Sequence, residues 1–135
     1  MEYIVSDYEN TLKKFYSIVL EERGLVWESD TTYKEILDLD IKQISVDYNE
    51  SKIVRYLQEQ SIEHLRVIQA VVYIGEDYSN DLTGMTRDEI LNTFIKEFSS
   101  MEGNDDNEVI IIELYDKAQL GKYLKDGLEK LNVNV

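Results

Sequence analysis

The sequence contains no cysteine, and this absence removes several kinds of chemistry at once. Without thiols the chain has no disulfide framework, no thiolate metal ligands and no thiol nucleophile. Proline is also absent, so no position forbids a long helix on that ground. Because glycine occurs only six times, boundaries between elements are marked mainly by clusters of Asn, Asp and Ser.

Long hydrophobic runs are missing as well. No apolar stretch approaches the roughly 20 residues that span a membrane. The first residues, MEYIVSDYENTLKKF, lack the basic and then apolar segments of a secretory signal. We therefore expect a soluble protein of the cytoplasm, and a bacterial cytoplasm fits this composition.

Acidic residues dominate the charge, with 28 Asp and Glu against 14 Lys and Arg and a formal net charge of −14. Such a surface repels phosphate backbones and anionic membranes and attracts cationic partners. The charge predicts no direct binding to nucleic acid or membrane and favours another protein, in particular a basic one, as partner. The same acidity also serves solubility alone.

Helical periodicity is clearest in the middle of the chain. Ser61 is placed to begin a helix that continues to about residue 77. Its apolar residues fall on every face, as expected of a central helix: Ile62, Leu65, Val67, Ile68, Ala70, Val71, Val72 and Ile74. The apolar run VVYI then meets Gly75, which we expect to let the helix end or kink.

Other helices are predicted on both sides of this one. Capping boxes, in which two side chains three residues apart satisfy backbone N–H groups at a helix start, are indicated at three places. The pairs are Ser6 with Glu9, Asp47 with Glu50, and Thr86 with Glu89. They predict helices over about residues 7–23, from about 47 to 60, and from 86 to about 98, with Gly24 ending the first.

The remaining segments carry weaker patterns. A short helix over 33–39 and an extended stretch over 41–46 are predicted, and residues 99–107 form a loop. Residues 109–112 are β-branched enough for a strand, but helical spacing continues to Leu131, so we favour one long or two adjoining helices. The fold predicted for residues 1–135 is a single all-α domain of five or six helices around the central one.

Catalytic residues are few. His64 is the only histidine, and no GxSxG or HExxH pattern surrounds it, so we expect an ordinary residue of a helix surface. Phosphate-binding glycine motifs are absent as well.

An acidic loop follows Gly75 and offers two kinds of site. Asp77, Ser79, Asp81 and Asp88 echo the spacing of a calcium-binding loop, but Leu82 stands where a sharp turn needs glycine. Asp77, Asp81 and Asp88 are therefore only weak metal candidates, and we predict no metal or other cofactor. The same region combines acids with tyrosines, a residue type favoured at interfaces. It predicts a partner-binding surface made of Tyr73, Glu76, Asp77, Tyr78 and Asp81.

Residues 56–78, YLQEQSIEHLRVIQAVVYIGEDY, resemble the core of the domain-of-unknown-function 3775 family of small bacterial proteins. The resemblance rests on Leu57, on residues 65–74 and on the turn at Gly75 with Asp77. Residues 117–131, KAQLGKYLKDGLEKL, are similar to the end of longer members of that family. Glu76 departs from the arginine often found after the glycine. The resemblance implies an all-helical domain and no particular activity.

Three functions are compatible with these observations. A non-enzymatic acidic protein–protein interaction module agrees best with the charge, the tyrosines and the lack of a catalytic pattern. An acidic inhibitor of a basic nucleic-acid enzyme, such as an immunity or phage anti-defence protein, is the first alternative. A metal-dependent hydrolase that uses the acids of residues 77–89 is the second.

Overall fold

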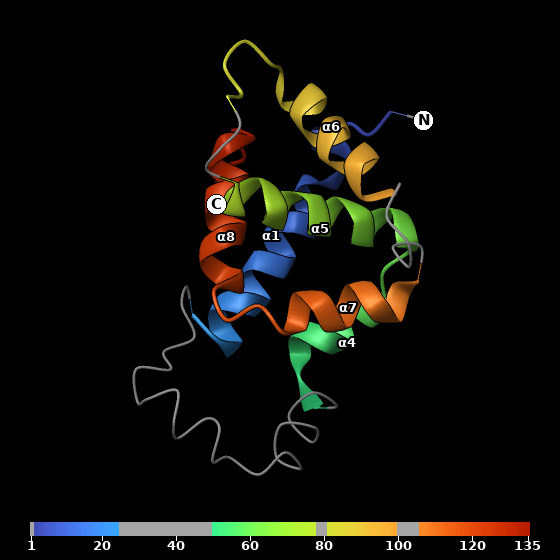
Figure 1. The fold of residues 1–135 in the computed structure, drawn as a ribbon. Coiled ribbons are helices and arrows are strands. Elements are labelled where there is room, and N and C mark those ends of the chain that lie inside the picture. Colours follow the sequence, from blue (N-terminus) through green and yellow to red (C-terminus); the bar gives the residue numbers. More distant parts are fainter. Residues whose placement is uncertain (1, 25–49, 78–80, 100–105) are drawn as a thin grey trace.

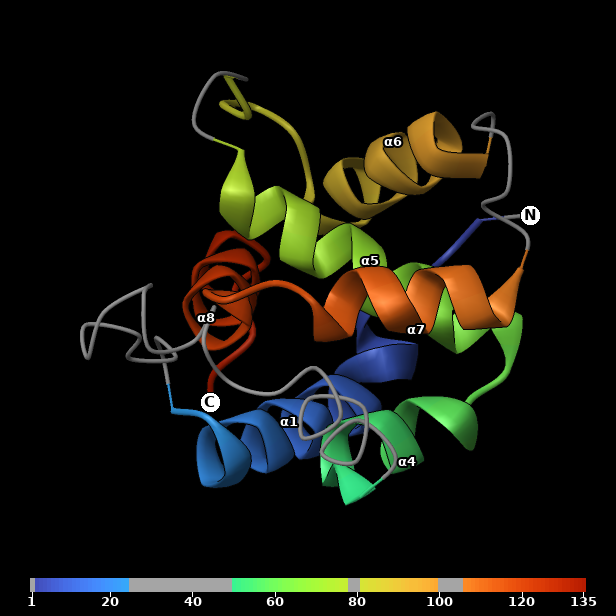
Figure 2. The same ribbon diagram turned by 60° about the horizontal axis from the view of Figure 1, so that its bottom comes forward.

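The helix α5, Ile62–Glu76, crosses the middle of the molecule in the computed structural model, which describes residues 2–24, 50–77, 81–99 and 106–135 (Figure 1). Four helices contact it: α1, Val5–Glu22; α6, Arg87–Ser99; α7, Asn107–Tyr115; and α8, Leu120–Lys130. A sixth, α4, Lys52–Gln58, packs against α1 and α7 (Figure 2). The described residues form helices and no strand, so the all-α prediction with a central helix is confirmed.

Burial on every side explains the composition of α5. Its buried residues include Leu65, Ile68, Val71 and Ile74, which point to different sides of the helix. Figure 1 shows α6 on one side of α5, α7 on the other, and α8 across its C-terminal half. Because each side faces another helix, α5 needs no polar stripe.

Two helix starts follow the local sequence as predicted. The Ser61 hydroxyl accepts a hydrogen bond from the His64 N–H at the start of α5. At the start of α6, the Glu89 N–H donates to the Thr86 hydroxyl oxygen at 3.2 Å, and the Thr86 N–H donates to the Glu89 carboxylate at 3.4 Å. This reciprocal pair confirms the third capping box.

Replacement of Thr86 by alanine is expected to lower the free energy of unfolding by about 1 kcal/mol, because it removes the acceptor for the Glu89 N–H. Chemical denaturation followed by circular dichroism measures the change. Thr86→Ser keeps the acceptor oxygen and should retain most of the stability. Equal losses in both variants would contradict a capping role.

The first helix does not use the predicted capping box of Ser6 and Glu9. It begins at Val5, and no side chain of its own first turn caps it. The carboxylate of Asp88, in the first turn of α6, instead accepts the Val5 N–H at 2.8 Å. A carboxylate at this position both satisfies a free N–H group and interacts favourably with the positive end of the helix dipole. At the other end, Gly24 has a φ of 73° and follows the helix as predicted.

The helix α4 also begins differently from the prediction. Its N-cap is Ser51, whose hydroxyl accepts the Val54 N–H. Glu22 of α1 reinforces this start, because its two carboxylate oxygens accept the Ser51 hydroxyl at 2.6 Å and the Lys52 N–H at 2.7 Å. Asp47 and the predicted elements at 33–39 and 41–46 lie outside the described residues.

Lys130 of α8 and Arg23, the residue after α1, bind the C-terminal ends of α5 and α7. The Lys130 ammonium group donates to the carbonyl oxygen of Ile74 at 2.9 Å and to that of Asp77. The Arg23 guanidinium donates to the Tyr115 carbonyl oxygen at 2.7 Å and lies over the Tyr115 ring. Free carbonyl groups and the negative end of the dipole favour a cation at both places.

Two glycines allow α5 and α8 to cross in backbone contact. Gly75 lies within α5, and a Cβ atom on it would stand 1.7 Å from the Tyr123 carbonyl oxygen. A Cβ atom on Gly127 of α8 would stand 2.0 Å from the Val71 carbonyl oxygen. As predicted, α5 ends beside Gly75, with Glu76 as its last residue. The crossing gives a second reason for glycine at this position, since no side chain fits between the two helices.

The C-terminal segment is helical, as favoured over a strand. α7 starts at Asn107 after the N-cap Asp106, whose carboxylate accepts the Glu108 N–H. The helix α8 follows within the same domain, and both Gly121 and Gly127 lie buried inside it. Residues 109–112 form a helix because one side of the run packs against α4 and α5.

Candidate functional site

The predicted partner surface after Val72 is mostly occupied by contacts within the protein. Lys117 lies over the Tyr73 ring, 4.6 Å from its centre, and its ammonium group forms an ion pair with Glu76 at 3.1 Å. The Tyr73 ring also contacts the Phe98 ring at a centroid distance of 4.4 Å. These contacts attach the last turn of α5 to the segment before α8 and to α6.

Two other residues predicted for that surface, Asp77 and Asp81, make separate contacts within the protein. The Asp77 carbonyl oxygen accepts Lys130, whereas Asp81 lies beyond the end of α5. Hydrogen bonds from the Thr83 hydroxyl and, next, from the Thr83 N–H lower the pKa of the Asp81 carboxyl. Their stabilising contribution is present above the ordinary pKa of an aspartate and is lost as the pH falls through the lowered value. Tyr78 lies outside the described residues.

The three weak metal candidates do not come together as one ligand set. The Asp88 carboxylate accepts the Val5 N–H at the start of α1, and the Asp81 carboxylate accepts the Thr83 N–H. Asp77 is the residue that follows the last turn of α5. Within residues 2–24, 50–77, 81–99 and 106–135, no three Asp, Glu or His side chains are grouped closely enough for a metal ion.

His64 has a local role. Its Nδ1 atom lies 2.7 Å from the Ser61 hydroxyl oxygen, and its ring meets the Tyr8 ring edge to face at 5.1 Å. Burial, followed by the charge of Glu63, raises the pKa of the Tyr8 hydroxyl. These contacts join the start of α5 to α1, in agreement with the expected helix-surface histidine.

A different surface stands out on α7. Val109 and Ile112 are 45% and 46% exposed, although α7 buries Ile110, Ile111 and Leu114 on its opposite side. The spacing of three residues places the two exposed side chains next to each other on the helix. Val109 and Ile112, together with the neighbouring acids Glu108, Glu113 and Asp116, form what we call the α7 outer face.

Carboxylates surround the apolar pair of the α7 outer face. At 100° per residue, Glu108, Glu113 and Asp116 fall on the same half of the helix as Val109 and Ile112. Glu108 and Asp116 are exposed, and the Glu113 carboxylate accepts a hydrogen bond from the Gln69 amide at 3.3 Å. The result is an apolar strip beside two exposed carboxylates, Glu108 and Asp116, with the Glu113 carboxylate held at the edge against α5.

Sequence reasoning did not select this surface, although a signal was present. The run VIII over residues 109–112 is too uniformly apolar for a helix that packs on one side only. Part of it must therefore face either water or a partner. Only the packing of α7 on α4 and α5 shows that the exposed members are Val109 and Ile112.

Comparisons with protein families, with curated proteins and with solved structures find no match for this chain. The resemblance to the domain-of-unknown-function 3775 family thus stays a prediction. None of the helices in the described part of the chain combines the length and the apolarity that a membrane span requires.

Proposed function

We propose that this protein is a non-enzymatic interaction module of the cytoplasm that binds a basic amphipathic helix of a partner protein on the α7 outer face. The observation that carries the proposal is the exposed pair of Val109 and Ile112, set among carboxylates on a helix whose other side is buried. Apolar side chains held in this way on a rigid helix can receive the apolar side of another helix.

The charge of the protein favours a cationic partner. Carboxylates around the strip would lie beside Lys and Arg residues at the edges of the incoming helix, and complementary charges of this kind accelerate association and suppress wrong partners. The net charge of −14 extends the attraction beyond the contact itself. The same charge opposes nucleic acid as the direct partner.

A synthetic amphipathic helix of leucine and lysine provides a defined test. We expect it to bind the wild-type protein, and the double variant Val109→Ser with Ile112→Ser to bind it at least tenfold more weakly, since both apolar contacts are lost. Fluorescence anisotropy of the labelled peptide gives the dissociation constants. Added salt should weaken binding to the wild type because the contacts with Glu108 and Asp116 are exposed to solvent.

Two matched controls separate the strip from general charge attraction. Leu20→Ser removes a side chain of similar exposure, 38%, from α1, and should leave peptide binding unchanged. A scrambled peptide of equal composition keeps the charge but has no apolar side, so it should bind weakly. Equal binding of both peptides, or by wild type and double variant, would refute the α7 outer face as the binding site.

A further inference from the structure

The α7 outer face has a regular order along the helix. Glu108, Ile112 and Asp116 follow one another at intervals of four residues, so they form one row in which neighbours are offset by about 40° around the helix axis. Asp116 belongs to this row because the backbone stays helical there, with φ and ψ of −74° and −10° and its N–H bonded to the Ile112 carbonyl oxygen at 3.0 Å. At the rise of an α-helix, about 12 Å along the axis separates the two acids, with Ile112 midway and Val109 beside it.

The two carboxylates at the ends of this row are available to a partner. Glu108 and Asp116 are exposed, and within residues 2–24, 50–77, 81–99 and 106–135 neither side chain forms an ion pair or a hydrogen bond. Glu113 differs from them, because its carboxylate accepts a hydrogen bond from the Gln69 amide of α5. The charge that a partner meets on α7 is therefore concentrated at the two ends of the row.

Cations close to Asp116 in the structure are engaged by other groups. Lys117, the next residue in the chain, forms an ion pair with Glu76 at 3.1 Å. Arg23 donates to the Tyr115 carbonyl oxygen and lies over the Tyr115 ring. The protein thus holds both cations away from an ion pair with the Asp116 carboxylate, which a basic residue of a partner can form instead.

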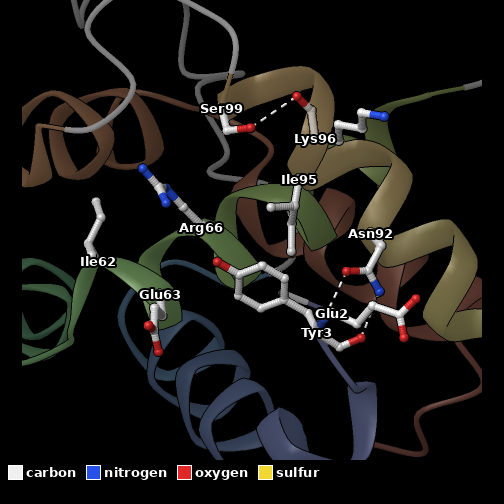
Figure 3. Close-up of a pocket in the computed structure, with 9 residues that line it drawn as sticks. All are labelled: Glu2, Tyr3, Ile62, Glu63, Arg66, Asn92, Ile95, Lys96 and Ser99. Carbon is white, nitrogen blue, oxygen red and sulfur yellow. Dashed lines mark hydrogen bonds between the residues drawn. The ribbon is translucent and has the colours of Figure 1, made fainter.

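The cavity beside the N-terminal segment has a less regular arrangement of charges (Figure 3). Arg66 of α5 and Lys96 of α6 line this cavity, but their head groups point in opposite directions. The two cations therefore do not act together on one ligand group. On α7, by contrast, two like charges stand at a fixed separation on either side of an apolar side chain.

We infer that the partner helix carries two basic residues seven positions apart, with an apolar residue between them on the same side, and this inference rests on the function proposed above. Residues at positions i, i+3 or i+4, and i+7 share one side of a helix. Seven residues advance about 10.5 Å, close to the separation of the two acids, and the long basic side chains cover the difference. Each cation would then meet one carboxylate while the apolar residue contacts Val109 and Ile112.

Charge spacing determines specificity here because the apolar strip is short. Two half-exposed aliphatic side chains accept many apolar surfaces without distinguishing their register. A partner with both cations at one end can pair with only one carboxylate of the row, whereas a partner with the matched spacing pairs with both. Complementary charges thus select the register of the bound helix.

Two synthetic peptides of equal composition test the spacing. Both have an alanine-rich helical background with a leucine pair and two arginines. The spaced peptide carries its arginines seven residues apart, on either side of the leucine pair, and the clustered peptide carries both on one side of it. We expect the wild-type protein to bind the spaced peptide about two- to fivefold more tightly at low salt, since one additional exposed ion pair forms. Fluorescence anisotropy of labelled peptides gives the ratio of dissociation constants.

Substitutions of single acids assign the preference to the row. Glu108→Gln and Asp116→Asn each leave one carboxylate, so each variant should bind the two peptides equally. Glu129→Gln is the matched control, because it removes the same charge from an exposed position of α8. This variant should keep the preference of the wild type for the spaced peptide.

The possible results separate this inference from the function on which it rests. Binding of both peptides with equal affinity by the wild type would overturn the charge spacing and leave the α7 outer face as a binding site. Binding of neither peptide would refute both proposals. A preference that persists in Glu108→Gln and Asp116→Asn would overturn the assignment to these acids. A wild-type dimer in sedimentation velocity that Val109→Ser with Ile112→Ser dissociates would identify a second copy of the chain as the occupant and overturn the inference.

Discussion

Replacement of Gly75 by alanine is expected to destabilise the protein by about 3 kcal/mol or more, although alanine is the better helix former by about 1 kcal/mol. The new methyl group would stand 1.7 Å from the Tyr123 carbonyl oxygen and 2.7 Å from the Gly127 nitrogen. Both atoms belong to the backbone of α8, so no side-chain rotation can relieve the clash. Urea denaturation followed by circular dichroism gives the change in the free energy of unfolding.

The same reasoning applies to Gly127 of α8 at this crossing. Gly127→Ala would bring a methyl group to 2.0 Å from the Val71 carbonyl oxygen, and a comparable loss is expected. Gly84→Ala is the control: Gly84 has a φ of 84° but open space around it. We expect a cost of about 1 kcal/mol there, from backbone strain alone. Unchanged or raised stability in Gly75→Ala would contradict close contact between α5 and α8.

The second large effect is expected at Asn92, which attaches the N-terminal segment to α6. Its side-chain oxygen accepts the Tyr3 N–H at 2.8 Å, and its amide nitrogen donates to the carbonyl oxygens of Tyr3 and Asp88, both at 2.7 Å. Asn92→Asp has nearly the same shape but no donor, and at neutral pH it places a carboxylate against two carbonyl oxygens. A loss of about 2–4 kcal/mol is expected in the free energy of unfolding.

The pH dependence of this variant has a definite sign. Nearby carbonyl oxygens favour the protonated acid in the folded protein, so the folded-state pKa of the introduced carboxyl is raised above its unfolded value of about 4. The destabilisation should therefore shrink as the pH falls from neutral toward about 4. Asn10→Asp adds the same charge at an exposed position of α1 and serves as the control. Similar losses in both variants would indicate general charge repulsion instead of lost hydrogen bonds.

Several elements could be predicted because their causes are local in the sequence. Ser61 begins α5 and Thr86 with Glu89 begins α6, since each cap joins residues only three positions apart. The apolar residues of α5 likewise required a buried helix whatever surrounded it. Periodicity and capping residues thus determined the central helix and the all-α class.

The capping of α1 could not be predicted in this way. Ser6 and Glu9 have suitable spacing, but the helix starts at Val5 with Asp88 as its acceptor, 83 residues away in the sequence. Distance along the chain also explains why the charges near Gly75 suggest a partner surface when only the sequence is considered. Glu76 instead meets Lys117, 41 residues away, and the Asp77 carbonyl meets Lys130. Spacing along the chain carries no information about such partners.

The stretch VVYIGED and the run VIII contain what the sequence by itself determined and what it left open. From the sequence alone, VVYIGED is predicted to be the end of a buried helix. The run VIII is more apolar than a helix that packs on one side needs. Only the tertiary structure decided that Gly75 serves a backbone crossing with α8, and that Val109 and Ile112 are the residues of α7 left facing solvent. The reason is that both depend on which helices pack together, and contacts between distant segments are fixed by the shapes of whole helices and not by neighbouring residues.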